Sequence, residues 1–369
     1  MATGTVTRSI VTQLTDRHVP AERAARVRPV LIWATAGALL IVFEVLVLAR
    51  WVFGANFTTT KPGPDRISAG THALYVGIQV AVLLGMLAVM YVFVVRPWRR
   101  YGRLSTDGML ALSCAALFFW DMNMNYTSLT LFYNSHLLNM GAWANGAFPG
   151  WITPNGNLLP EPLLVCLPGY TALCFTQVVL MLWILRRIKA RRPHLGRLGT
   201  VVTIVVGLTV IDTIIETILL RLGVYAYPGG IRAITLYAGH TYQLPMSEPV
   251  FFAGLGLGAA AALSHFRDDH GRTLVERGLD RVQLSSGARQ GVKFLAIFGA
   301  VHLAFIALYF VPNQWLATHS GPFPQGYKSY MINGMCDYPG VHSAPQTRGT
   351  PGVTCPGPGV PIPRPKGTL

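Results

Sequence analysis

Long apolar stretches alternate with short polar ones along the whole chain. Seven stretches approach the roughly 20 apolar residues that a helix needs to cross the hydrocarbon core of a bilayer. They cover residues 30–53, 72–95, 108–125, 162–185, 200–220, 249–266 and 291–311. The third and sixth are the weakest, being short or rich in Gly and Ala. The pattern predicts an all-α fold, a polytopic membrane helix bundle with about seven transmembrane helices.

Charge places the ends of these helices. Only 12% of the 369 residues are charged, about half the roughly 25% of soluble domains. Of the 30 basic residues, 21 lie before the first stretch or in the loops 96–103, 186–197 and 267–293. Short basic loops are cytoplasmic, so we expect a plasma-membrane protein with a cytoplasmic N-terminus and an external C-terminus. The net charge of +15 then records topology and does not indicate a nucleic-acid partner.

These boundaries divide the chain into three parts. Residues 1–29 form a basic cytoplasmic leader, and the first apolar stretch after it is too long for the core of a signal peptide. Residues 30–311 form the bundle, with external aromatic loops at 121–161 and 221–249. Residues 312–369 form a Pro/Gly-rich external tail, which we expect to be irregular.

Acidic residues are scarce, and six of the fifteen lie inside an apolar stretch or at its external end. These six are Glu44, Asp121, Glu161, Asp212, Glu216 and Glu248. An ionisable group in a membrane helix costs on the order of 3 kcal/mol, so it normally faces the bundle interior or a wet cavity. Because all six fall toward one side, they predict a single polar cavity that opens outward.

The spacing of the acids favours catalysis. Asp212 and Glu216 are four residues apart, which puts both carboxyl groups on one helix face, and Asp121 and Asn125 repeat that spacing. Two carboxylates this close in a low dielectric do not both ionise easily, an arrangement used in general acid–base chemistry. The alternative is a buried pair hydrogen-bonded for helix packing, and this structural role is the favoured one for Glu44.

Two Glu-Pro steps suggest an internal duplication. Glu161-Pro162 and Glu248-Pro249 each precede an apolar stretch, where the acid is expected to cap a helix that begins at the proline. Each glutamate follows a polar pair, Asp121 with Asn125 or Asp212 with Glu216, by a similar number of residues. The third and fourth stretches are therefore a possible two-helix repeat of the fifth and sixth, related by an axis along the membrane normal.

The two external loops are rich in aromatic residues interleaved with amides and imidazoles. Such residues form either an interfacial belt or a pocket that holds an apolar ligand at a few polar points. The candidate substrate-binding residues are Trp120, Asn125, Asn134, Trp143, Tyr225, Tyr227 and Tyr242.

Other motifs are better explained by structure. The glycines at 254, 256 and 258 lie in an apolar stretch with no preceding strand, which favours helix packing over dinucleotide binding. His302 is expected to be a hydrogen-bonded core residue. No lysine lies at mid-membrane, which excludes a retinal Schiff base, and we expect neither a metal nor a cofactor.

Cysteine positions agree with the predicted topology. Cys114, Cys166 and Cys174 lie in apolar stretches, where a thiol is usually a small packing residue. Cys336 and Cys355 share the external tail and are able to pair in an oxidising compartment.

The ordered motifs resemble those of the AveC-type spirocyclases, a family of actinobacterial membrane proteins. The resemblance covers roughly residues 30–310. The matching segments are Phe119-Trp120-Asp121 with Asn125, Phe132-Tyr133-Asn134, Trp143, Pro160-Glu161-Pro162, Asp212 with Glu216, Gly223-Val224-Tyr225-Ala226-Tyr227, and Glu248-Pro249. The resemblance implies cyclisation of a dihydroxy-ketone polyketide to a spiroketal without a redox cofactor.

Such a cyclisation needs a proton donor, a negative charge beside an oxocarbenium ion and a base, demands that glycosidases meet with two carboxyl groups. We expect Glu216 or Asp212 to be the acid, and Asp121, Glu161 or Glu248 to be the charge stabiliser or base. Asn125, Asn134, Tyr225 and Tyr227 would hold substrate oxygens.

Three other interpretations stay open. A lipid or isoprenoid hydratase or dehydratase would use the same groups, and a proton-coupled transporter of an apolar small molecule would also need buried carboxyl groups. A purely structural membrane protein does not explain six costly acids. The expected partners are an apolar small-molecule substrate and the lipid bilayer, while the substrate, the stereochemistry and the oligomeric state stay undetermined.

Overall fold

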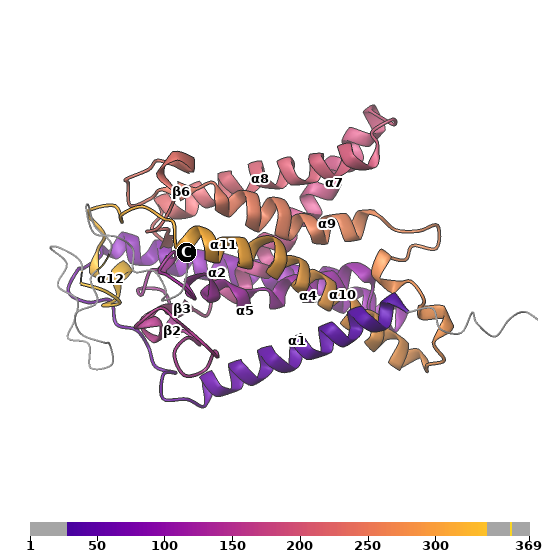
Figure 1. Ribbon diagram of the computed structural model, residues 1–369, viewed down its shortest axis with the longest axis horizontal. Helices are drawn as coiled ribbons and strands as arrows, with labels where there is room; N and C mark the ends of the chain where they lie inside the picture. The colour runs from indigo at the N-terminus through magenta and orange to yellow at the C-terminus, as the bar shows by residue number, and fades with distance from the viewer. Residues whose placement is uncertain (1–27, 338–354, 356–369) are drawn as a thin grey trace, which may run out of the picture.

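The computed structural model describes residues 28–337 and Cys355, and the described part of the chain is mostly helical. Its longest helices lie side by side along the long axis of the molecule (Figure 1). They are α1 (Pro29–Val52), α2 (Ala69–Met90), α7 (Thr176–Arg191), α8 (Arg197–Arg221) and α10 (Ser286–Phe305). The leader up to residue 27 and the tail residues 338–354 and 356–369 lie outside the described residues.

Three of these helices continue through short π-helical segments. The continuations are η2 (Tyr91–Val95) and α3 (Arg96–Tyr101) after α2, α6 (Cys166–Gly169) and η5 (Tyr170–Phe175) before α7, and η10 (Ile306–Phe310) and α11 (Val311–Ala317) after α10. By length and composition, five helical stretches in the described part of the chain are able to cross a membrane. They are Pro29–Val52, Ala69–Tyr101, Cys166–Arg191, Arg197–Arg221 and Ser286–Ala317.

The third and sixth predicted spans are helical but do not reach that standard. The third is divided into α4 (Thr106–Ala116), α5 (Phe118–Asp121) and the 3₁₀ segment η3 (Met122–Asn125). The sixth consists of the π-helix η7 (Glu248–Leu257) followed by α9 (Gly258–His265). The described chain is therefore mostly helical with five candidate spans, whereas seven crossings and the two-helix repeat stay predictions.

The third segment forms the centre of the bundle. Almost every residue from 106 to 125 is buried, including Ser113, Asn123 and Asn125, and α4 packs against α2, α9, α10 and η5. These polar side chains weaken the apolar pattern of the segment in the sequence. A helix enclosed by other helices tolerates them because it does not contact lipid.

Close backbone contact joins α1 to α10. A Cβ atom placed on Gly299 would lie 2.4 Å from the carbonyl oxygen of Trp33, and the facing position in α1 is Gly37. Only glycine permits this approach, which is a common way for membrane helices to pack.

Short strands gather at one end of the bundle, the left end in Figure 1. They are β1 (Phe132–Tyr133), β2 (Asn139–Gly141), β3 (Pro160–Pro162), β4 (Tyr225–Ala226), β5 (Thr235–Leu236) and β6 (Leu244–Pro245). They form three antiparallel pairs, β1 with β4, β2 with β3, and β5 with β6. The β1–β4 pair joins the two predicted external loops and places Tyr133 opposite Tyr225.

Two expectations about this end were wrong. Pro162 was predicted to begin a helix, but Pro160–Pro162 pairs with β2 as strand β3, and the helix begins at Cys166. The chain from residue 312 was predicted to be irregular, but α11 extends to Ala317. In both places long-range contacts, which a local pattern does not reveal, determine the conformation.

The chain after α11 covers the strands. It includes helix α12 (Ser329–Ile332), and the Nδ2 group of Asn333 donates a hydrogen bond to the carbonyl oxygen of Tyr133 at 3.1 Å. Cys336 and Cys355 form a disulfide, the pairing that the sequence left open.

The basic loops meet at the opposite end. Arg267 forms an ion pair with Asp107, and Lys293 lies 2.8 Å from Glu276. The 3₁₀ segments η8 (Leu274–Glu276) and η9 (Leu279–Arg281) belong to this end, whereas η4 (Gly156–Leu158) and η6 (Arg232–Ile234) belong to the loops of the strand end.

Candidate active site

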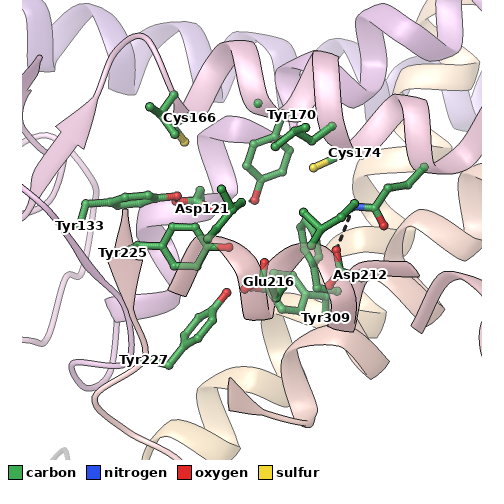
Figure 2. A pocket seen from close by; sticks show the side chains of 17 residues that line it. Asp121, Tyr133, Cys166, Tyr170, Cys174, Asp212, Glu216, Tyr225, Tyr227 and Tyr309 are labelled. Atoms are coloured by element: carbon green, nitrogen blue, oxygen red, sulfur yellow. Dashed lines mark hydrogen bonds between the residues drawn. The ribbon is translucent and has the colours of Figure 1, made fainter. Parts of the chain in front are cut away.

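A cavity of about 70 Å³ lies among the helices, and Tyr133 of β1 and Tyr225 of β4 belong to its lining (Figure 2). Three carboxyl groups line it, from Asp121, Asp212 and Glu216. The other polar or sulfur-containing lining residues are Tyr133, Cys166, Tyr170, Cys174, Gln177, Tyr225, Tyr227 and Tyr309. The remaining wall is mostly apolar, as is typical of a small-molecule site.

Asp121 is held by two tyrosines. The hydroxyl of Tyr133 donates to Oδ2 and the hydroxyl of Tyr170 donates to Oδ1, each at 2.9 Å. The thiol of Cys166 is a further hydrogen-bond partner. Because each carboxylate oxygen receives a separate donor, the orientation of the Asp121 side chain is fixed.

Asp212 and Glu216 lie on the buried ridge of α8, whose buried positions recur at every fourth residue from Thr200 to Leu220. The Gln177 amide donates to Oδ1 of Asp212 at 2.9 Å. Within the described residues, Oδ2 of Asp212 and Oε2 of Glu216 are buried without a hydrogen-bond partner. A buried polar atom normally has a partner, so these two oxygens are available to a ligand or to water.

Two tyrosines from the loop after α8 reach the carboxyl group of Glu216. Tyr225 and Tyr227 are hydrogen-bond partners of Glu216, and all three side chains point into the cavity in Figure 2. Burial and the neighbouring Glu216 raise the pKa of both tyrosines well above the usual value, so each hydroxyl keeps its proton and remains a donor.

Glu161 and Glu248 lie one side chain behind the wall. The Tyr309 hydroxyl, which lines the cavity, donates to Oε2 of Glu248 at 2.8 Å. Glu161 reaches the cavity through the thiol of Cys166, its hydrogen-bond partner. Burial, and then the charge of Asp121, raises the pKa of Glu161 well above its ordinary value.

Glu44 is the one acid of the predicted six that belongs elsewhere. Its Oε1 lies 2.8 Å from Nδ1 of His302 and accepts a hydrogen bond from the Trp120 indole at 3.2 Å. Nε2 of His302 lies 3.1 Å from the carbonyl oxygen of Ser113. Glu44 therefore joins α1 to α10 in the bundle core, in agreement with the structural role favoured for it and for His302.

Five of the predicted substrate-binding residues lie outside the cavity lining: Trp120, Asn125, Asn134, Trp143 and Tyr242. Asn125 accepts backbone hydrogen bonds from Thr130 and Leu131, and so fixes the turn before β1. The Asn134 amide donates to the carbonyl oxygen of Gly223 at 2.8 Å.

The two other aromatic rings also have neighbours outside the cavity. Trp143 stacks on Phe119 with ring centroids 5.7 Å apart, and Tyr242 stacks on His240 at 5.0 Å. Of the predicted set, Tyr225 and Tyr227 line the cavity.

Several lining residues were not chosen as candidates from the sequence. Cys166, Tyr170, Cys174 and Gln177 follow one another at intervals of four, four and three residues, which places them on one helix face. The two cysteines were interpreted as packing residues, although this repeated spacing was a usable signal.

Backbone irregularity also marks the cavity. Tyr170, Phe252 and Tyr309 lie in the π-helices η5, η7 and η10. Extra residues in a helical turn redirect side chains, and such segments occur frequently at functional sites.

The fold and the cavity define a class: a helical protein with membrane-length apolar helices and a buried cluster of carboxyl and tyrosyl groups. The chain belongs to the spirocyclase AveC-like family, whose sequence model matches residues 98–332. This range contains every residue that lines the cavity. No curated protein and no solved structure matches the chain. Within the described residues, no group of three or more His, Cys, Asp or Glu side chains is placed to hold a metal ion.

Proposed function

We propose that this protein is a membrane-embedded cyclase that uses carboxyl groups for a dehydrative cyclisation, spiroketal formation or a close relative of it. The observation that carries the proposal is the convergence of Asp121, Asp212 and Glu216 on one tyrosine-lined cavity in a member of the spirocyclase AveC-like family. The substrate is an apolar polyketide or lipid that carries hydroxyl groups and a ketone.

The reaction divides into two halves. One hydroxyl of the substrate adds to the ketone and gives a hemiketal. A carboxylic acid then protonates the hemiketal hydroxyl, water leaves, and the second hydroxyl attacks the oxocarbenium carbon while a carboxylate takes its proton. The net change is the loss of one water, with no oxidation or reduction.

Hydrogen bonding and spacing support a role for each carboxyl group. Two tyrosine hydroxyls donate to Asp121, which favours its ionised form and suits it to stabilise the positive oxocarbenium ion. Asp212 and Glu216 are close neighbours on one helix face, so one of them keeps its proton and serves as the acid. Glu161 and Glu248, each one side chain away, serve as proton reservoirs through Cys166 and Tyr309.

The size of the cavity adds a requirement. A volume of about 70 Å³ holds a few water molecules, whereas sites for drug-sized ligands span roughly 300–1,000 Å³. Substrate entry therefore requires the wall to move. The part we propose to move is the non-helical β1–β4 pair, which contributes Tyr133 and Tyr225 to the wall.

We propose that the cavity lies toward the external side of the plasma membrane, with the N-terminus cytoplasmic and seven crossings. The Cys336–Cys355 disulfide at the strand end supports this orientation, because disulfides persist in oxidising compartments. The basic residues gathered at the other end support it as well.

The test compares chemically matched variants of buried acids in purified, lipid-reconstituted protein. Synthetic apolar dihydroxyketones are supplied, and product is followed by chiral chromatography with mass spectrometry, after subtraction of spontaneous cyclisation. Glu216→Gln and Asp121→Asn are expected to lower turnover by about 100-fold or more, the range of general acid–base catalysis. Glu44→Gln, outside the cavity, should keep turnover within a few-fold.

Full turnover by Glu216→Gln and Asp121→Asn, in folded protein, would overturn the assignment. Hydration or dehydration of an apolar lipid without ring closure would identify the alternative enzyme class. Ligand flux driven by a proton gradient, with no chemical change, would identify a transporter.

A further inference from the structure

A second hollow, remote from the carboxyl groups, lies between the end of α7 and the beginning of α8. It is a cleft of about 730 Å³ at the basic end of the bundle, near the turn between α7 and α8 at the upper right of Figure 1. Its lining combines an indole, aliphatic side chains and guanidinium groups, with Trp183, Ile184, Arg187, Ile188, Arg191 and Arg192 from the α7 side. We call this hollow the arginine cleft.

The α7-side residues of the arginine cleft fall into two rows along the helix, one of Trp183, Arg187 and Arg191 and the other of Ile184, Ile188 and Arg192. Trp183, Arg187 and Arg191 follow one another at intervals of four residues and so share one face of α7. Along this face the side chains change from an indole to guanidinium groups toward the end of the helix. The Arg187 guanidinium lies over the Trp183 ring, 5.0 Å from its centroid. This cation–π contact restrains the arginine side chain at the mouth of the cleft.

The arginines of the cleft form no ion pair with an acidic side chain of residues 28–337. In residues 28–337, the ion pairs of the basic end involve Arg267, Arg272, Arg289 and Lys293, and none involves an arginine of the cleft. Lys189, on the same helix, contacts His265 on another side. Three guanidinium groups thus line one cleft beside an apolar wall, with no acidic partner among the described residues.

This combination matches an amphipathic anion. A guanidinium group presents a planar fork of donors that fits phosphate oxygens, and several such groups bind an anion far better than one. Ile184 and Ile188 line the same cleft as the guanidinium groups and give an acyl chain an apolar wall, and Trp183 adds an aromatic ring of the kind found at membrane interfaces. A soluble phosphate would use the arginines and leave the apolar wall empty.

We propose that the arginine cleft binds the headgroup of an anionic phospholipid of the cytoplasmic leaflet, with its acyl chain along Ile184 and Ile188. The position follows from the topology in which the basic loops are cytoplasmic, where anionic lipids attract basic segments. This binding site is independent of the carboxyl cavity, so it holds whether or not the proposed cyclase activity does.

The test measures lipid retention by native mass spectrometry of the full chain, purified in detergent and supplied with phosphatidylglycerol or phosphatidylcholine. The double variant Arg187→Gln/Arg191→Gln is compared with Arg186→Gln/Arg197→Gln, which removes the same charge from neighbouring positions outside the cleft lining. Loss of the two cleft arginines should weaken phosphatidylglycerol binding by about 30-fold, and the control pair by no more than about 3-fold.

A second measurement uses the fluorescence of Trp183, which lines the cleft. Phosphatidylglycerol with brominated acyl chains should quench tryptophan fluorescence more than brominated phosphatidylcholine does, and Trp183→Phe should remove that difference. Inorganic phosphate at millimolar concentration should not displace the lipid. Equal retention of both lipids by the wild-type chain, equal losses in the two double variants, or displacement by phosphate would each overturn the proposal.

Discussion

The pair formed by Glu44 and His302 offers a sharp test of how the bundle is held together. Both side chains are buried, Glu44 at 5% exposure and His302 at 0%, and their contact joins residues 258 positions apart in the chain. We consider three variants: Glu44→Leu, His302→Leu and the two combined.

The magnitudes follow from the partners that each variant leaves behind. In Glu44→Leu the Nδ1 atom of His302 loses its carboxyl partner, and in His302→Leu the carboxyl group retains only the Trp120 indole. Removing one member of a buried hydrogen-bonded pair typically costs about 1–3 kcal/mol, because a polar atom of the other member stays buried without this partner. Replacing both by apolar residues of similar volume is often close to neutral. The double variant should therefore be less destabilised than either single variant.

The assay is the free energy of unfolding in mixed micelles, obtained by titration with a denaturing detergent and followed by fluorescence. The four proteins form a double-mutant cycle, which isolates the coupling between the two side chains. If the destabilisation of the double variant equals the sum of the two single values, the side chains do not act as a pair and the reasoning fails. Turnover of the double variant should remain near that of the wild type, because neither residue lines the cavity.

Three other predictions concern packing, pH and the cysteines. Gly299→Ala should destabilise the protein because its Cβ meets the α1 backbone, whereas Gly291→Ala, with nothing within 4 Å, should stabilise it by about 0.5–1 kcal/mol, as unfolding titrations will show. The pKa of Glu161 is raised in the folded protein, so its contribution to stability is full below the unfolded-state pKa of about 4.3 and is lost as pH rises through the folded-state pKa. A plot of unfolding free energy against pH for Glu161→Gln should lack that loss. In denaturant, maleimide should label three of the five cysteines before reduction and all five after it, and labelling of Cys336 or Cys355 before reduction would contradict the disulfide.

The apolar helices and the pair Asp212 and Glu216 were predictable because each is marked by a residue pattern within a single helix. Five apolar runs of membrane length needed only hydropathy, and the four-residue spacing of Asp212 and Glu216 on an apolar helix needed only helix geometry. Both carboxyl groups line the cavity. Asp121, singled out in the sequence at the end of a short apolar stretch, lines the cavity as well, and its catalytic role stays a prediction.

The rest depended on contacts between distant residues. Six acids toward one side of a membrane look alike in a sequence, and only the fold separates Glu44, beside His302, from the three that face the cavity. Tyr309 approaches the site from the last long helix, 61 residues after its partner Glu248. Pro160–Pro162 becomes a strand because β2 is available to pair with it.

The pairing of β1 with β4 has a consequence for the timing of events at the cavity. Tyr133, which donates to Asp121, faces Tyr225, which reaches Glu216, across a single rung of that ladder. A displacement that keeps the rung intact moves both tyrosines together. Under the proposed opening of the wall, Asp121 and Glu216 would lose these two hydroxyl partners in one step, so the opening and the hydrogen bonding of both carboxyl groups would share a single conformational coordinate.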